Sequence, residues 1–159
     1  MKRTLIAAIA LIVCATSLSA KDYVRNEKMN STKDNIVGEY FIVDEDGTSH
    51  ARFVKASDGT YYCQTYGGKP TYDKNGKLML DEYNPDPSLR SIPLHEAIII
   101  SGLKYNSEKK QWDGGKIHHP LKRMLKSACT VDFVGDGRTL RVFGHIGPIG
   151  ASRYWTKKN

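Results

Sequence analysis

The sequence KSACTVDFVGDGRTLRVFGHIGPIGASRYWTK, residues 126–157, decides the fold class. It contains three short runs rich in β-branched and aromatic residues, at 126–134, 139–146 and 151–157. The turn sequences Gly-Asp-Gly and Gly-Pro separate these runs. Asp-Gly between runs of alternating polarity is a strong signal for a β-hairpin. We therefore predict three consecutive antiparallel strands at the end of the chain.

The same pattern of short strands and turns extends back through the chain. Five further runs precede these three, at 36–43, 50–56, 60–66, 95–105 and 111–119. No segment has a helical period of useful length. The pattern predicts an all-β fold, an eight-stranded antiparallel up-and-down β-barrel of lipocalin-like form, because closure removes the exposed edges of a sheet. A sandwich of two sheets is the alternative.

The run 111–119 also predicts strong curvature. Trp112 and Ile117 are five positions apart, an odd number, so a regular strand would place them on opposite faces. Glycine permits the extra residue of a β-bulge. We predict a bulge at Gly114-Gly115 that turns both side chains into the barrel.

One long insertion, residues 69–94, interrupts the succession of strands. It is too long for a hairpin loop, and Pro85 and Pro87 exclude an inner strand. We predict a lid or plug over one barrel mouth, with Leu89 and Leu94 as its apolar contacts. An ornate surface loop is the alternative.

The start of the chain has the order of a signal peptide. Met1-Lys2-Arg3 is followed by an apolar run, residues 5–15, and then by small and polar residues. We predict a signal peptide over 1–20, a flexible leader over 21–35 and one barrel domain over 36–159. The protein is then periplasmic or secreted, with no transmembrane segment after cleavage and no nucleic acid partner. A lipid anchor on Cys14 is disfavoured, because lipid attachment requires a small residue before the cysteine.

Charge is distributed unevenly along the chain. Residues 21–103 carry 10 basic and 13 acidic side chains, whereas residues 104–159 carry 12 basic and 4 acidic ones. The basic third fits contact with envelope phosphates or acidic glycans. A solvated surface that keeps the protein soluble is the alternative.

Two cysteines remain after the signal peptide is removed. Cys63 and Cys129 are an even number in an oxidising compartment. A disulfide requires Cα atoms within about 7 Å, and the predicted strands are not sequential neighbours. The sequence therefore leaves open a disulfide or two small buried hydrophobic side chains.

Several motifs together resemble one bacterial family. They are Gly38-Glu39-Tyr40, NPDPSLRSIPL at 84–94, WDGGKIHHP at 112–120, TLRVFGHIG at 139–147 and Tyr154-Trp155-Thr156. Across about 120 residues the chain resembles the exported domain-of-unknown-function family 2147. The resemblance implies a lipocalin-like or fatty-acid-binding-protein-like barrel and no established reaction. Tyr40 departs from the tryptophan usual at this position of the family.

The sequence offers little for catalysis or metal binding. His118 and His119 are adjacent, so in a strand they point to opposite faces and do not chelate one ion. His95-Glu96 has the same difficulty as an acid–base pair, and no serine lies in a nucleophile motif. We predict no enzymatic activity, no metal site and no cofactor.

Binding is the natural use of a small closed barrel. Ligand pockets are mostly apolar with a few orienting polar groups. Three arginines, Arg90, Arg141 and Arg153, are candidates to hold a carboxylate or phosphate head group. The candidate pocket walls are Tyr40, Tyr62, Ile98, Ile100, Trp112, Ile117, Phe133 and Trp155.

We expect a small hydrophobic or amphiphilic ligand in the barrel. The alternative is a cell-envelope protein-interaction module with a barrel filled by its own side chains and no small-molecule ligand. An apolar cavity favours the first function, and a filled interior with an exposed aromatic patch favours the second.

Overall fold

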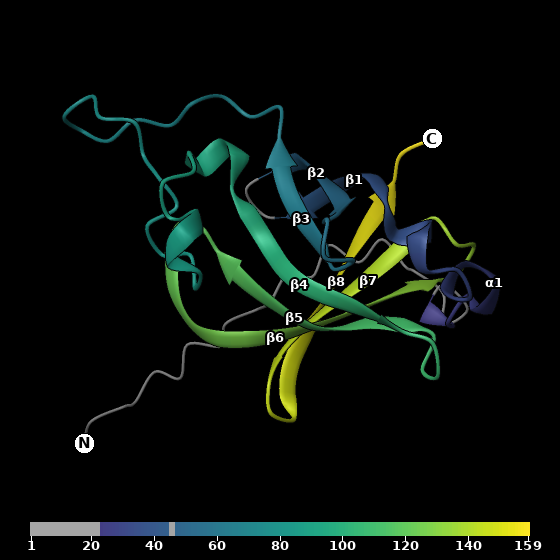
Figure 1. The fold of residues 1–159 in the computed structure, drawn as a ribbon. Helices are drawn as coiled ribbons and strands as arrows, with labels where there is room; N and C mark the ends of the chain where they lie inside the picture. Colours follow the sequence, from purple (N-terminus) through teal and green to yellow (C-terminus); the bar gives the residue numbers. More distant parts are fainter. Residues whose placement is uncertain (1–22, 45–46) are drawn as a thin grey trace, which may run out of the picture.

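The computed structural model describes residues 23–44 and 47–159 (Figure 1). The predicted signal peptide, residues 1–20, lies outside the described residues. Eight strands form a closed antiparallel barrel in which each strand pairs with its sequence neighbours. The strands are β1 (Gly38–Asp44), β2 (Gly47–Lys55), β3 (Tyr61–Tyr66), β4 (Ile98–Asn106), β5 (Gln111–His119), β6 (Lys122–Val134), β7 (Thr139–Ile146) and β8 (Ile149–Lys157). The predicted up-and-down barrel is confirmed.

Several strand boundaries differ from the prediction: β1 begins at Gly38 rather than at residue 36, and β2 begins at Gly47 rather than at residue 50. Residues 94–96 form a short 3-10 helix, η4 (Leu94–Glu96), so β4 begins only at Ile98. β6 begins at Lys122, four residues before the predicted start, and β8 begins at Ile149. Both strands are lengthened by pairing with a neighbouring strand, a tertiary effect that a local sequence pattern does not show.

The predicted bulge in β5 is confirmed. The pairing of β5 with β6 shifts between Trp112 and Gly115, and Gly114 has a φ of 71°. Trp112 is fully buried, and Ile117 packs against the same core. Gly115 is required by a close approach, because a Cβ there would lie 2.7 Å from Cδ2 of Leu103.

The segment before β1 closes one end of the barrel. It contains α1 (Glu27–Asn30) and the 3-10 helix η2 (Lys33–Ile36). Asn30 is fully buried, and its side chain bonds both backbone groups of Phe133, at 2.7 and 3.0 Å. The prediction of a flexible leader is therefore corrected for residues 23–35. The Asn30 side chain pairs with the backbone N–H and C=O of Phe133, which closure of the barrel end would otherwise leave unpaired.

Aromatic side chains fill the half of the barrel beside α1. Trp112 meets Phe133 edge to face with 5.9 Å between the ring centres, and Tyr40 meets Phe53 at 5.4 Å. The Trp112 indole N–H donates to the carbonyl of Lys33, 2.9 Å away. This half of the barrel is a packed core, as expected of an eight-stranded barrel that fills itself with side chains.

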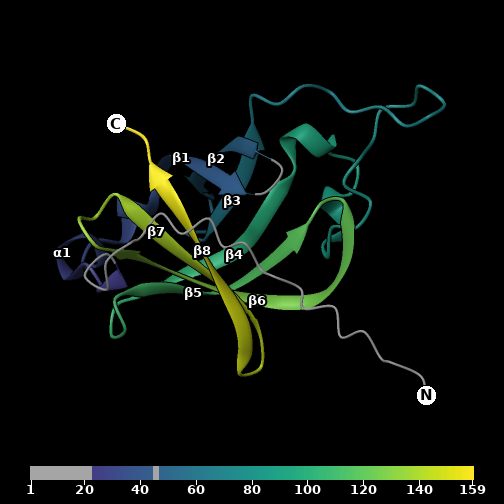
Figure 2. The same ribbon diagram turned by 180° about the vertical axis from the view of Figure 1, so that it is seen from behind.

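The insertion between β3 and β4 is anchored to the side of β5. Asp81 is fully buried, and both of its carboxylate oxygens lie 2.9 Å from Nε2 of His118. Asn84 donates to the same carboxylate at 2.9 Å. The insertion continues through the 3-10 helix η3 (Pro87–Leu89) and lies beside β4 and β5 (Figures 1 and 2).

Candidate functional site

The open end of the barrel lies opposite α1. In an antiparallel up-and-down barrel, the turns after β1, β5 and β7 share one end, and the insertion after β3 shares it too. The other end contains the β6–β7 turn, where the Asn26 side chain bonds Gly135 at 3.0 Å. The α1 segment therefore covers one end and leaves the other free for a pocket.

A pocket of about 260 Å³ occupies this open end, which we call the mouth pocket. All of its lining residues come from β5, β6, β7 and β8. They are Ile117, His118, His119, Ser127, Val142, Gly144, Ala151, Arg153 and Trp155. The expectation that the insertion covers the mouth is corrected, because no insertion residue lines this pocket.

The floor of the mouth pocket is apolar. Val142 and Trp155 are almost fully buried, and Ile117 packs beside them. Above this floor Gly144 pairs with Ala151 across β7 and β8. Both positions line the pocket, and Ile117 packs against Gly144, where an added Cβ would lie 3.3 Å from Cγ2 of Ile117.

Polar groups lie at the rim. Arg153 has the same strand parity as Trp155 and Ala151, so it projects from the inner face of β8, where it is exposed to solvent. One guanidinium N–H donates to the carbonyl of Ser152 at 3.2 Å. The imidazole of His119 lies on the opposite strand of the pocket. An arginine and a histidine at an apolar mouth are suited to an anionic head group.

The predicted wall residues divide into three groups. Trp155 and Ile117 line the mouth pocket. Four others, Tyr40, Ile100, Trp112 and Phe133, are fully buried in the packed core. The predicted inward orientation of Tyr62 is wrong, because its neighbours Tyr61 and Cys63 face inward and Tyr62 has the opposite parity. Ile98 is half-exposed at the start of β4 and lies outside the mouth pocket.

Only one of the three predicted arginines reaches the mouth pocket. Arg153 lines it, whereas Arg141 projects from the outer face of β7. There it donates to both oxygens of Asp132 at 2.8 and 2.6 Å, and this partner raises the pKa of the guanidinium. Arg90 is exposed in the insertion and donates to the carbonyl of Asn84 at 2.8 Å. Arg141 and Arg90 have structural partners outside the pocket.

Sequence reasoning missed Val142, Gly144, Ala151 and Ser127. The signal was present in part, since Ala151 and Arg153 precede Trp155 by four and two residues and share its face. Val142 and Gly144 become visible only through the pairing of Val142 with Arg153 and of Gly144 with Ala151. The sequence does not give the register between β7 and β8, and without it these residues could not be assigned to the pocket.

Both cysteines are free, buried thiols on the inner face of the barrel. Burial raises the pKa of Cys129 to about 12. Burial, and then the nearby Cys129, raise the pKa of Cys63 well above its usual value. The structure therefore has the thiols rather than the disulfide that the sequence left open, and protonated buried thiols are inert.

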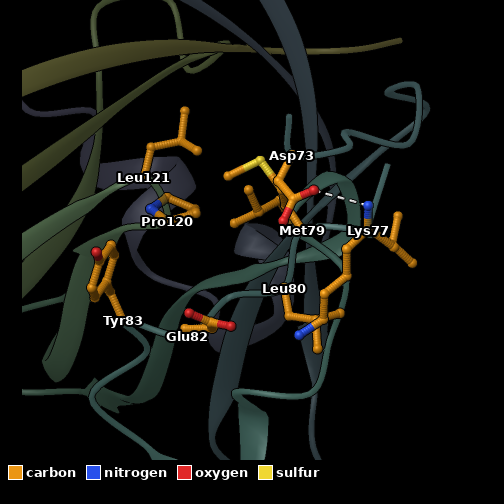
Figure 3. Close-up of a pocket in the computed structure, with 10 residues that line it drawn as sticks. Asp73, Lys77, Met79, Leu80, Glu82, Tyr83, Pro120 and Leu121 are labelled. Carbon is orange, nitrogen blue, oxygen red and sulfur yellow. Dashed lines mark hydrogen bonds between the residues drawn. The ribbon is translucent and has the colours of Figure 1, made fainter. Parts of the chain in front are cut away.

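A second hollow, of about 250 Å³, lies under the insertion. Figure 3 shows Pro120 and Leu121, from the β5–β6 turn, on one side and Met79 and Lys77 on the other. The Asp73 carboxylate accepts a hydrogen bond from the backbone N–H of Lys77 at 2.9 Å. Leu94, predicted as an apolar contact of the insertion, lines this hollow rather than the barrel mouth.

Among the described residues there is neither a cluster of metal-binding side chains nor a helix that could span a membrane. Within residues 23–44 and 47–159, no three His, Cys, Asp or Glu side chains gather where they could hold a metal ion. None of the helices in these ranges is long and apolar enough to cross a membrane.

Comparison with known proteins places the barrel in a family. The model of the family described as "Uncharacterized protein conserved in bacteria (DUF2147)" matches residues 38–157. The chain belongs to this family. The match runs from the start of β1 to the end of β8, so the DUF2147 region is the whole barrel. No curated protein and no solved structure matches the chain.

The structure joins two segments of the matched region that lie far apart in the sequence. Asn84 begins the segment 84–94, and His118 lies in the segment 112–120. Both side chains bond the buried carboxylate of Asp81. The Asn84 side chain also donates to the carbonyl of Ile98 at 3.3 Å. This network holds the insertion beside the open end of the barrel.

Proposed function

We propose that the protein is an exported, non-enzymatic binding protein that holds a small apolar or amphiphilic molecule in the mouth pocket. The observation that carries the proposal is an apolar recess on the inner face of the barrel with an arginine at its rim. Small closed barrels hold single small ligands at this place. The signal-peptide sequence at residues 1–20 supports export to the periplasm or the medium.

The pocket indicates the kind of ligand. Its volume of about 260 Å³ is below the usual range of roughly 300–1,000 Å³ for drug-sized ligands. The ligand is therefore small, or only partly enclosed. Its apolar part lies against Ile117, Val142 and Trp155, and its anionic head group lies at Arg153 and His119. A medium-chain carboxylate fits this description.

Two probes separate the apolar and the charged contributions. Isothermal titration calorimetry of the mature protein with decanoate and with decanol measures binding with and without a carboxylate. Replacing Ala151 by Phe fills the recess from an exposed position and leaves the core intact. Replacing Arg153 by Gln removes the rim charge. Arg138→Gln is the matched control, since Arg138 is exposed at the opposite end.

The proposal predicts a distinct pattern in this experiment. Decanoate binds the wild type, and Ala151→Phe abolishes the binding of both probes. Arg153→Gln weakens decanoate about tenfold or more, because a hydrogen bond to a charged group contributes about 1.5–3 kcal/mol. It leaves the affinity for decanol unchanged. If Ala151→Phe binds both probes as tightly as the wild type, the mouth pocket is not the site.

One observation favours the second candidate function, a protein-interaction module of the cell envelope. The half of the barrel beside α1 is filled by side chains, and large apolar residues are exposed at the open end. A partner that occupies the mouth would use the same surface. In that case neither decanoate nor decanol binds, and the mature protein co-purifies with one envelope protein.

A further inference from the structure

The edge of β8 that faces β1 is paired over only part of its length. Thr156 and Lys157 pair with Phe41 and Tyr40 of β1. Residues 149–155 pair with β7 on one side, and on the other side no described residue pairs with them. In both ribbon views the tip of the β7–β8 hairpin points away from β1 and β2 (Figures 1 and 2). We call residues 149–155, on the side away from β7, the free edge.

Backbone hydrogen bonds show which residues of β8 point toward the free edge. The N–H of Lys158 donates to the carbonyl of Glu39, at the start of β1. The N–H of Lys157 donates instead to the carbonyl of Arg138, beside the start of β7. Because this direction alternates along an antiparallel strand and the β7–β8 register has no shift, the even-numbered residues of β8 turn their backbone groups away from β7. On the free edge these residues are Gly150, Ser152 and Tyr154.

The free edge has little of the protection usual for an exposed strand. Natural edges carry charged side chains, prolines or bulges that prevent pairing with another chain. Residues 146–152 contain no charged side chain, and their only proline, Pro148, lies in the turn. One outward carbonyl, that of Ser152, accepts a hydrogen bond from the Arg153 guanidinium at 3.2 Å. The other outward backbone groups of the free edge have no such cover, so the edge is suited to pairing with a further strand.

We infer that the free edge pairs with the free edge of a second copy of this chain. An antiparallel arrangement with its two-fold axis at Ser152 places Gly150 opposite Tyr154 of the second copy. It also places Ser152 opposite Ser152 of the second copy. This register uses the outward N–H and C=O groups of all three residues on both edges. The Arg153 contact does not prevent it, because a carbonyl oxygen has a second lone pair.

The side chains of the inner face favour a second copy over an unrelated strand. Ile149 shares the strand parity of Ala151 and Trp155, and it is 79% exposed. In the two-fold register the partner's Ile149 lies opposite Trp155, on the floor of the mouth pocket. Arg153, the one charged residue of the free edge, lies opposite Ala151, so like charges do not meet. The second copy thus covers an exposed apolar side chain and contributes a residue to the pocket.

Sedimentation velocity of the full mature chain measures the pairing without any ligand. Ser152→Pro removes an outward N–H and keeps the bonds to β7, since an edge strand tolerates proline where the N–H faces away from the sheet. Ser152→Ala is its matched control, because it keeps the N–H. Ile149→Ser removes the apolar contact. Its control is Ile146→Ser, which removes an exposed isoleucine from β7 of the same hairpin. Circular dichroism confirms that each variant folds.

The inference predicts a concentration-dependent dimer for the wild type and for both controls. Ser152→Pro and Ile149→Ser each weaken dimerisation about tenfold or more, because each change is present in both copies. Isotope-filtered NMR of mixed labelled and unlabelled chains shows contacts between the Ile149 methyl groups and the Trp155 indole. Within one chain these two residues lie about 20 Å apart along β8, so the contacts come from the second copy.

Two results would overturn the pairing. One is a wild type that stays monomeric at every concentration at which it is soluble. The other is a dimer that Ile149→Ser and a folded Ser152→Pro leave unweakened, which would place the contact on another surface. The pairing goes beyond the proposed function and does not depend on it. A monomer that binds decanoate contradicts the pairing alone, whereas a dimer that binds neither decanoate nor decanol contradicts the proposed function alone.

Discussion

Replacing Asp81 by Ala removes the centre of the network that holds the insertion to β5. The carboxylate is fully buried and accepts hydrogen bonds from Nε2 of His118 at both oxygens, each at 2.9 Å, and from the Asn84 side chain at 2.9 Å. The substitution leaves the His118 ring, itself nearly buried, without this partner. It also removes the acceptor of the shorter of the two hydrogen bonds that the Asn84 amide donates.

The magnitude follows from these contacts. Removing one partner of a buried pair costs about 3–5 kcal/mol, and each buried polar group left unsatisfied costs about 1–3 kcal/mol. Asn84 keeps a longer bond to the carbonyl of Ile98, at 3.3 Å. We therefore expect Asp81→Ala to lower the free energy of unfolding by about 3 kcal/mol.

Urea unfolding followed by tryptophan fluorescence measures this change. With an m-value of about 2 kcal/mol/M, the midpoint falls by about 1.5 M. Glu82→Ala is the matched control, because it removes the adjacent, exposed carboxylate of the same insertion. That change stays within about 0.5 kcal/mol. A double-mutant cycle of Asp81→Ala with His118→Ala then gives a coupling energy of about 1.5 kcal/mol or more.

The reasoning is refuted by either of two results. A loss of less than about 1 kcal/mol in Asp81→Ala would mean that the buried carboxylate is not a net stabilising anchor. A coupling energy below about 0.5 kcal/mol would mean that the two side chains act independently.

Three further predictions concern titration and the end of the chain. The raised pKa values of Cys63 and Cys129 mean that folding favours the protonated thiols, so this stabilisation is complete below about pH 8.5 and is lost as pH rises. Urea titrations from pH 8 to 10.5 should show unfolding free energy falling by up to about 1.4 kcal/mol per pH unit for each thiol, and a smaller slope in Cys129→Ala. The main cause that lowers the pKa of Asp34 is the hydrogen bond from Tyr61. Tyr61→Phe should therefore raise this pKa, which an NMR titration of the Asp34 carboxylate measures. An unchanged pKa would contradict that cause. Lys158→Met removes an ammonium that hydrogen bonds to His50 on β2 at 2.6 Å and to Tyr66 on β3 at 2.7 Å. It should lower the free energy of unfolding by about 1 kcal/mol. An unchanged free energy in urea unfolding would show that these contacts do not stabilise the fold.

The barrel could be predicted because its signals are local. Asp-Gly turns separate runs of alternating residues, and each run needs only its neighbours to be recognised. The β5 bulge is predictable for the same reason, since the parity of Trp112 and Ile117 conflicts unless the two glycines add a residue.

The closed end and the pocket could not be predicted in this way. α1 is four residues long and shows no period, and its position depends on bonds from Asn30 to Phe133, 103 residues away. Gly144 and Ala151 both line the mouth pocket, and only the β7–β8 register brings these two together. Arg153 has the same strand parity as Trp155, so the sequence alone could have placed it on the inner face. The residues that Arg153 faces depend on strand pairing, which the sequence does not give.

An NMR titration tests the central claim most directly. Decanoate is added to the ¹⁵N-labelled mature protein, and amide and indole shifts are followed. We predict that the Trp155 indole and the amides of Gly144, Ala151 and Arg153 shift together and saturate, while the amides of α1 stay unchanged. Shifts confined to the hollow under the insertion, or no saturable shift at Gly144 and Ala151, would contradict a ligand site at the mouth of the barrel.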